Sequence, residues 1–426
     1  MKDTYKNVHT HIFTMDNAPE KFLQLFLPKP VANAVDTATN SQLGVLLLSG
    51  LIAQFGSQGK RYAQFLKIGK SKDQITVFEE LMAQYSDPSI ELVALTINMN
   101  YMGIGATKSG FEGQLQKVID IKRRYPERLL LFFGLDPRWQ QSGTDIRKEV
   151  ERYFETKIDS GGRSIYPFTG LKIYPSNGFY AFDERLKETF AWAADNGVPV
   201  LSHTNYLGGI FSHDPQAIQQ NLNPLNPYTD QVYDVPKFIH KKSRKEWLTG
   251  SNLTNNCKRT CSYFLEPHGF ESVLNHFNNA NNPLKICFAH YGGSEQMLAS
   301  MNGSSDAEQV HPYGVKDVNW YTQIQYLMTQ YPGAYTDISY NVAEGVKAND
   351  NVLFNAFFKE CNKPYGQKIM YGTDFFLAEK ESPEKNTYDA FRTFASDKTL
   401  DNGHNFWDQI ARENTNAFLK SKYYDL

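Results

Sequence analysis

Short apolar runs rich in β-branched and aromatic residues alternate with stretches of helical period along most of the chain. Each run ends in polar residues or glycine and is followed by a helical pattern, which is typical of successive βα units. Eight runs predict strands at residues 5–13, 92–98, 129–135, 170–174, 199–203, 284–290, 334–339 and 368–374. Helices are predicted at residues 111–125, 145–157, 183–196, 269–279, 320–331 and 352–361, with a closing helix at 406–420.

Eight strands separated by helices favour a closed (β/α)₈ TIM barrel of the α/β class over an open doubly wound sheet. Closing the ring removes both sheet edges, whereas an open sheet of eight successive parallel strands would leave two. The whole chain, residues 1–426, is therefore predicted to be a single domain. Long segments follow the first and fifth strands, at residues 14–89 and 205–268, and are predicted as large insertions. They would stand above the active face as a lid or substrate-selecting walls, or serve as decoration or an oligomer contact.

Composition and charge narrow the classes of partner. The 44 Lys+Arg residues nearly balance the 46 Asp+Glu residues, for a formal charge of −2, so no basic surface is expected for nucleic acid or for a membrane. No apolar run approaches the roughly 20 residues of a membrane span, and the N-terminal sequence lacks the apolar region of a signal peptide, so a cytoplasmic location is expected. The four cysteines are too sparse for a disulfide framework and are expected to be reduced thiols. A small-molecule substrate is expected, and a homo-oligomer is left open.

Candidate chemistry begins in the first predicted strand, which contains the sequence His9-Thr10-His11. Side chains of a strand alternate between two faces, so both imidazoles can reach one ion. The motif alone is a weak signal, because two histidines at this spacing occur by chance in many chains. Whether the two histidines bind a metal therefore has to be judged from their position at the end of a strand.

Three further apolar runs end in ionisable residues that could join the pair. The fifth run ends at His203, the sixth at His290 and the eighth at Asp374. In a barrel the carboxyl ends of all strands surround one mouth, so these residues would converge although they are far apart in the chain. The alternative for each histidine is a polar residue that only caps its strand, and this is much less probable for the whole set than for one member.

Three neutral imidazoles and a carboxylate suit one divalent ion, with Zn²⁺ favoured and Mn²⁺ or another transition metal as alternatives. Such an ion lowers the pKa of a coordinated water from 15.7 to about 7. Asp374 could accept the proton of that water. His290 could polarise the oxygen of the substrate or shuttle a proton.

Taken in order, these motifs resemble those of the amidohydrolase superfamily, and within it the amidohydrolase-2 branch, which includes aminocarboxymuconate-semialdehyde decarboxylase. The resemblance covers nearly the whole chain. It rests on His9-Thr10-His11, Gly170-Leu171-Lys172-Ile173-Tyr174-Pro175, Leu201-Ser202-His203, Phe288-Ala289-His290-Tyr291-Gly292-Gly293, Tyr371-Gly372-Thr373-Asp374 and Glu413-Asn414-Thr415-Asn416-Ala417. It implies a barrel that uses His9, His11 and His203 as metal ligands, Asp374 as ligand and acid/base, and His290 as a catalytic histidine.

Lys172 on the fourth predicted strand is open to three interpretations. In binuclear relatives of this family a lysine there is carboxylated and bridges two metals, although the branch usually holds one ion. An unmodified ammonium roughly 6 Å from a dication would cost about 5 kcal/mol at an effective dielectric of 20, so a charged Lys172 needs an anionic neighbour. It could instead contact a substrate carboxylate, or be a structural lysine in a salt bridge.

Further candidates for substrate contacts follow other strands. Arg138 could hold a substrate carboxylate through two hydrogen bonds, or pair with a loop acid such as Asp136. Tyr174 and Tyr291 could line the pocket, or simply pack at strand ends.

Three functions are compatible with this site. The first is a metal-dependent hydrolase that attacks an amide, ester or lactone. The second is a non-oxidative decarboxylase of an aromatic or unsaturated acid, which Arg138 or Lys172 facing the metal would favour. The third is a non-catalytic barrel that binds a metal or a partner.

Overall fold

The computed structural model describes residues 4–22, 73–139, 145–205, 209–222, 224–233, 253–302 and 319–424. Residues 23–72 of the first predicted insertion lie outside this part of the chain, as do residues 206–208, 223 and 234–252 of the second.

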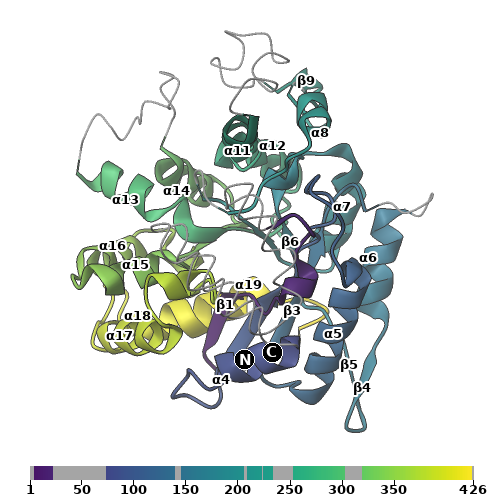
Figure 1. Cartoon of the computed structure of the whole chain (residues 1–426). Coiled ribbons are helices and arrows are strands. Elements are labelled where there is room, and N and C mark those ends of the chain that lie inside the picture. The colour runs from purple at the N-terminus through teal and green to yellow at the C-terminus, as the bar shows by residue number, and fades with distance from the viewer. Residues whose placement is uncertain are drawn as a thin grey trace, which may run out of the picture.

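One sheet of parallel strands forms the centre of the molecule (Figure 1). Its eight strands follow one another in chain order as β1 (Lys6–Thr10), β2 (Glu91–Leu95), β3 (Leu129–Leu135), β6 (Gly170–Ile173), β7 (Val200–Ser202), β10 (Ile286–Phe288), β11 (Ala334–Asp337) and β12 (Ile369–Met370). All eight predicted strands are therefore confirmed. Every strand except β3 ends before its predicted run does, because the last residues of the run bend into the loop above the barrel.

The ring closes between the last strand and the first. The backbone N–H of Val8 donates to Tyr371 O at 3.0 Å, and that of Asp374 donates to His9 O at 2.9 Å. A further parallel bridge joins Thr10 to Phe375. The sheet thus has the strand order and the closure of the predicted (β/α)₈ barrel.

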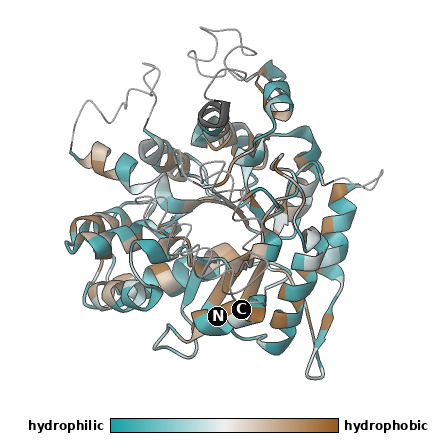
Figure 2. Cartoon of the chain, in the orientation of Figure 1, coloured by the Kyte–Doolittle hydropathy of each residue, from teal (hydrophilic) through white to brown (hydrophobic). Residues whose placement is uncertain are grey.

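Helices surround the barrel, and the predicted ones are present, most of them with shifted ends. They are α5 (Gly110–Arg124), α6 (Ile146–Glu155), α7 (Lys187–Asp195), α12 (Glu271–His276), α14 (Trp320–Gln330) and α16 (Val352–Cys361). The closing helix consists of α18 (Phe406–Asp408), the π-helical turn η10 (Gln409–Glu413) and α19 (Asn414–Leu419). Figure 2 shows both polar and apolar residues on each of many outer helices, as expected for helices that bury one face against a sheet.

Several elements were not predicted from the sequence. They are α13 (Ser294–Met301), α15 (Asn341–Ala348), α17 (Glu384–Ser396) and the antiparallel hairpin of β4 (Ile158–Ser160) and β5 (Arg163–Ile165). The described part of the first insertion contributes the 3₁₀ turn η1 (Met15–Asn17) and α4 (Gln74–Met82), and α4 packs on α5. The second contributes α8 (Pro215–Gln220), the hairpin of β8 (Leu225–Asn226) and β9 (Gln231–Val232), and α11 (Leu253–Tyr263). α11 packs on α8 and on the turn η3 (Pro175–Asn177) after β6.

Apolar side chains fill the lower part of the barrel and leave its mouth to polar residues. The interior cluster contains Val8, Val93, Leu95, Leu130, Phe132, Leu201, Cys287 and Met370, and Phe418, Leu419 and Tyr424 join it from the end of the chain. Near the two chain ends, which lie together in Figure 1, the side chains of Thr4 and Tyr424 both donate to Glu91. None of the helices in the described ranges has the length and apolar character that a bilayer crossing requires.

Candidate metal centre

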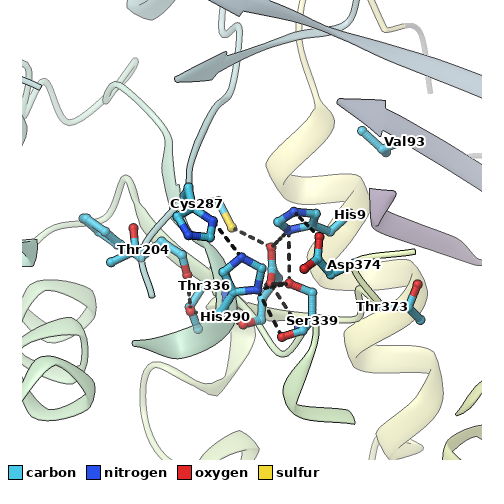
Figure 3. Close-up of polar contacts among 12 residues, drawn as sticks. His9, Val93, Thr204, Cys287, His290, Thr336, Ser339, Thr373 and Asp374 are labelled. Atoms are coloured by element: carbon cyan, nitrogen blue, oxygen red, sulfur yellow. Dashed lines mark hydrogen bonds and ion pairs between the residues drawn. The ribbon is translucent and has the colours of Figure 1, made fainter. Parts of the chain in front are cut away.

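Six ionisable side chains gather at the C-terminal mouth of the barrel, and none is more than 5% exposed. They come from the ends of five strands and are His9 and His11 (β1), His203 (after β7), His290 (in the turn η6, Ala289–Tyr291, after β10), Asp337 (β11) and Asp374 (after β12). Figure 3 shows His9, His290, Ser339 and Asp374 close together in this group. The structure thus brings the five predicted residues to one mouth and adds Asp337, which the sequence analysis did not single out.

A bulge in β1 turns His9 into the barrel. Val8 packs in the interior cluster, whereas the side chain of Asn7 points outward and donates to Tyr85 Oη at 2.7 Å. Simple alternation would place His9 on the outside with Asn7. The register with β2 shifts between Asn7 and Thr10, where β1 contains one residue more than its partner, and such an extra residue re-aims the side chains that follow it.

His9, His11 and Asp374 form a tight cluster of ligand atoms. Asp374 Oδ1 lies 3.4 Å from His9 Nε2 and 3.2 Å from His11 Nε2. The other ring nitrogen of each histidine faces an acceptor: His9 Nδ1 is 3.0 Å from Asp337 Oδ2, and His11 Nδ1 is 3.2 Å from Leu95 O. Each Nδ1 therefore carries the hydrogen, and each Nε2 presents a lone pair to the carboxylate.

Three electron-pair donors that face one another in a buried site repel unless a cation lies between them. His9 Nε2 and Asp374 Oδ1 are both buried and have no hydrogen-bond partner among the residues that the structure describes. Donor atoms around a tetrahedral ion with bonds of 2.0–2.1 Å lie about 3.3 Å apart. The orphaned atoms, the imidazole and carboxylate donor set and the spacing all fit a divalent cation such as zinc.

Asp337 holds the histidines behind this cluster. Besides His9 Nδ1, it accepts the backbone N–H of His290 at 3.0 Å and of Ser339 at 3.0 Å, and a short contact from Ser339 Oγ. Burial alone would raise the pKa of Asp337, but His9, His290 and these hydrogen bonds lower it well below its ordinary value. The carboxylate is therefore ionised and fixes the tautomer of His9, which is the usual role of an acid hydrogen-bonded to a metal-binding imidazole.

Burial lowers the pKa of His9 to about 4 and also lowers the pKa of His290, each against the opposing effect of neighbouring aspartates. Burial favours a raised pKa for Asp374, but its histidine neighbours, first among them His11, lower it. At neutral pH His9 and His290 are thus neutral imidazoles beside an ionised Asp374. This is the protonation state in which both residue types bind metals.

His290 and His203 form a second, linked pair. His290 Nδ1 faces Ser339 O at 3.2 Å and Ser339 Oγ at 2.9 Å, so that nitrogen donates and His290 Nε2 accepts. His203 Nδ1, 3.0 Å away, then donates to His290 Nε2, which leaves His203 Nε2 as an electron-pair donor. The described part of the chain contains two groups of residues whose possible ligand atoms all lie close together: His9, His11 and Asp374, and His9, His290 and Asp337. His203 belongs to neither group.

His203 is packed between an aromatic ring and a glycine. Tyr174 stacks on its imidazole with ring centres 4.4 Å apart and planes at 10°. Gly209, whose φ is +79°, approaches so closely that a Cβ there would lie 2.5 Å from His203 Nε2. Glycine at this position lets the backbone after β7 cover the imidazole.

Both His290 and Asp374 adopt left-handed backbone conformations, with φ of 65° and 62°. Such conformations cost about 1–3 kcal/mol in a residue other than glycine and persist where the surroundings impose them. Asn341 Nδ2 donates to His290 O at 2.8 Å, and the N–H of Asp374 donates to the first strand. Strain in two residues at one mouth supports a functional role for that mouth.

Lys172 is on the interior face of β6 and is 1% exposed. Its Nζ has no hydrogen-bond partner within the described ranges and lies 5.4 Å from the centre of the Tyr174 ring. The described residues contain no ion pair to Lys172, so the alternative of a salt-bridged structural lysine is not the arrangement found. Burial lowers the pKa of Lys172 to about 8, and the nearby charges of Asp337 and Asp374 oppose this shift.

Arg138 and Tyr291, the two other candidates for substrate contacts, both pair with acids of the protein in this structure. Arg138 binds Asp136 with two hydrogen bonds, Nε to Oδ1 at 2.8 Å and Nη2 to Oδ2 at 2.6 Å, which is the loop pairing considered as its alternative. The hydroxyl of Tyr291 donates to Glu360 Oε2 on α16 at 2.7 Å. Tyr291 therefore lies in the helix layer instead of the pocket, because a buried phenol needs a polar partner and finds it there.

No protein-family model matches the chain, and no curated protein matches it. Several solved structures are similar to this one. An uncharacterised TIM-barrel protein from Bordetella bronchiseptica is 14% identical in sequence, and the alignment covers 97% of this chain and 98% of that chain with a TM-score of 0.45. A manganese complex of 5-carboxyvanillate decarboxylase from Novosphingobium aromaticivorans has 15% identity, 98% and 97% coverage and a TM-score of 0.47. A 4-oxalomesaconate hydratase from Rhodopseudomonas palustris has 11% identity, 98% and 95% coverage and a TM-score of 0.41. The fold assignment rests on the strand order and register described above.

Proposed function

We propose that this chain is a metal-dependent hydrolase of the amidohydrolase type that cleaves an amide, ester or lactone of a small molecule. One divalent cation, with zinc favoured, would be held by His9, His11 and Asp374, with His203 as a further ligand. One observation carries the proposal: the lone pairs of two buried Nε2 atoms are directed at the same carboxylate oxygen, at 3.4 and 3.2 Å. The order of motifs that resembles the amidohydrolase-2 branch supports it.

Each residue at the mouth has a role in this proposal. A bound divalent cation supplies Lewis acidity and lowers the pKa of a coordinated water. Asp374 accepts a proton at its carboxylate and returns it to the leaving group. His290 exchanges a proton or a hydrogen bond with the substrate at Nε2, the atom that faces His203 in this structure. Asp337 and Ser339 keep the imidazoles in the tautomers that leave these Nε2 atoms as electron-pair donors.

Non-oxidative decarboxylation at the same site is a second candidate, and Lys172 favours it. A decarboxylase needs a cationic group to hold the carboxylate of its substrate. Arg138 is already paired with Asp136, whereas the buried Nζ of Lys172 has no hydrogen-bond partner among the described residues. The ammonium of Lys172 near the mouth could therefore hold a substrate carboxylate in a decarboxylase. Because hydrolysis could occur at the same site, the reaction products have to be analysed to distinguish the two functions.

The test begins with the purified protein. Elemental analysis after incubation with zinc or manganese and removal of unbound metal should give about one ion per chain. A panel of esters, lactones, amides and aromatic acids is then assayed for hydrolysis and for release of carbon dioxide. Turnover that is lost in Asp374→Asn supports the proposal, and carbon dioxide as the product selects the second candidate. A protein that binds no transition metal contradicts both, and a tightly bound ion without turnover favours the non-catalytic barrel.

A further inference from the structure

Beside the cation cluster, the barrel contains a small cavity, lined by polar and apolar residues, that the proposed hydrolysis does not use. Its lining includes Asn98 after β2, Gly134 on β3, Lys172 on β6, and Asn177 in η3. The cavity volume is about 10 Å³, which is close to the space that one water molecule needs. It can therefore hold one oxygen-sized group at a time.

Three buried side chains of this cavity have a polar atom without a hydrogen-bond partner in the described part of the chain. These atoms are Lys172 Nζ, Asn98 Nδ2 and Asn177 Oδ1, and none of the three residues is more than 2% exposed. The remaining amide atoms are engaged: Asn98 Oδ1 accepts from Asn100 N at 3.3 Å, and Asn177 Nδ2 donates to Asn98 O at 3.3 Å. These bonds fix the orientation of both amides. The cavity therefore offers two donors and one acceptor.

Leaving a buried polar group unpaired costs about 1–3 kcal/mol. Three such groups lining one cavity would be a large cost for a purely structural feature. A ligand that satisfies them removes the cost on binding, which makes the cavity a candidate for recognition.

The charges around Lys172 select the kind of ligand. The carboxylate of Asp136 also lines the cavity, but Arg138 binds it at both oxygens. The two other nearby carboxylates, Asp337 and Asp374, are committed to the histidines and the cation cluster. A bound dication would balance the charge of these two aspartates, and the ammonium of Lys172 would then lack compensation. An anionic group of the substrate supplies it.

We propose that this cavity is an anion subsite, in which one carboxylate oxygen of the substrate accepts hydrogen bonds from Lys172 Nζ and Asn98 Nδ2. The substrate is then an organic acid whose carboxylate lies on the side of β2, β3 and β6, away from the ligands on β1 and β12. The inference rests on the proposed function for the site of reaction, but the subsite itself is built without the cation.

The subsite is tested by calorimetric titration with two matched probes, benzoate and its neutral analogue benzamide. Both are titrated into metal-free and zinc-loaded wild-type protein and into Lys172→Met, Lys172→Arg and Asn98→Leu. Lys385→Met, which removes an exposed lysine on α17, is the control. We expect benzoate to bind wild-type protein at least tenfold more tightly than benzamide. Lys172→Met should lose at least tenfold in benzoate affinity with benzamide affinity unchanged, and Lys172→Arg and Asn98→Leu should lose less.

Wild-type protein that binds neither probe, or that does not prefer benzoate, overturns the proposal, as does Lys172→Met with wild-type affinity. If Lys172→Met does not fold, Asn98→Leu carries the test, and benzoate affinity equal to that of wild type contradicts the subsite. A carbamate signal in the ¹³C spectrum after equilibration with labelled bicarbonate, absent in Lys172→Arg, also overturns it, because a carboxylated lysine is anionic. Failure to bind zinc would contradict the proposed function alone, since benzoate discrimination is also measured without metal.

Discussion

His9 Nδ1 and Asp337 Oδ2 lie 3.0 Å apart at the mouth of the barrel, with both side chains fully buried. The contact joins the first strand of the barrel to the seventh. It orients His9 so that Nε2 faces His11 and Asp374. Asp337, which is not one of the predicted ligands, therefore sets the geometry of the candidate metal centre.

The first prediction concerns this acid. Asp337→Asn removes the ionised acceptor and no longer imposes the His9 tautomer, so the affinity for zinc should fall by about 10–100-fold, as for other partners of metal-binding histidines. Zinc affinity is measured by competition with a chromophoric chelator. The control is Asp397→Asn, which changes an exposed aspartate. Equal zinc affinity in Asp337→Asn and wild type would show that the contact does not orient a ligand.

The second prediction separates the ligands from the other histidines. His11→Ala and His203→Ala should each reduce the zinc content from about one ion per chain to substoichiometric levels. Asp374→Asn should retain part of the metal and lose turnover, because the amide oxygen can still coordinate but cannot accept a proton. His404→Ala is the control, since His404 is exposed and pairs with Glu413. Full zinc content in His203→Ala would limit the ligand set to His9, His11 and Asp374.

The apolar runs were enough to predict the barrel, because strands such as β2 and β3 are buried on both faces and read as short, mostly apolar stretches. The same reasoning located His9, His11, His203, His290 and Asp374, since all of them stand where a run stops. Asp337 was hidden because the predicted seventh strand extends beyond it to residue 339, which made it a polar residue inside a strand instead of one at its end. The strand in fact ends at Asp337. A prediction that ended the strand at its first charged residue would therefore have included Asp337 among the candidate site residues.

Other features depend on contacts between distant parts of the chain and leave no local pattern. The bulge in β1 is visible only in the register with β2. The hydroxyl of Tyr291 pairs with Glu360, 69 residues further along the chain. The unpaired state of Lys172 likewise depends on which acids the fold brings near it, and this cannot be read from the sequence around the lysine.

The third prediction concerns the four cysteines, all of which are buried and free of disulfides. Burial raises the pKa of each thiol, to about 11 for Cys257 and well above the ordinary value for Cys261, Cys287 and Cys361. Because the thiolate is the reactive form, the native protein should react with DTNB roughly 100-fold more slowly than the denatured protein. Four equivalents of released chromophore in guanidinium provide the reference count. Rapid release of one equivalent from the native protein would reveal an accessible thiol and contradict the prediction.

The fourth prediction concerns the close approach of Gly209 to His203. A Cβ at position 209 would overlap Tyr174 Oη and lie 2.5 Å from His203 Nε2, and the φ of +79° is itself unfavourable for alanine. Gly209→Ala should therefore lower the thermal transition by several degrees and weaken zinc binding through His203. Gly161→Ala is a matched control, because Gly161 has a φ of +60° with no atom within 4 Å of the added carbon. If the two variants behave alike, backbone strain explains the effect and the contact with His203 does not.

The last prediction concerns Glu384, a carboxyl group on α17 that is 2% exposed. It accepts from Thr373 Oγ1 at 2.8 Å and from Tyr85 Oη, and it has no ion-pair partner within the part of the chain that the structure describes. Burial raises the pKa of Glu384 to about 7, although the hydrogen bonds from Tyr85 and Thr373 oppose the shift. The folded protein therefore binds this proton more tightly than the unfolded chain does.

Between pH 4.5 and 7, Glu384 should make the free energy of unfolding fall as the pH rises, since the native state carries more protons there. Glu384→Gln lacks this titration. Relative to wild type, the variant should gain on the order of 2 kcal/mol in the free energy of unfolding between pH 5 and pH 8. The measurement is urea denaturation of metal-free protein at both pH values, with exposed Glu80→Gln on α4 as the control. Parallel pH dependence in wild type and Glu384→Gln would mean that Glu384 is already ionised at pH 5 and that its hydrogen bonds outweigh its burial.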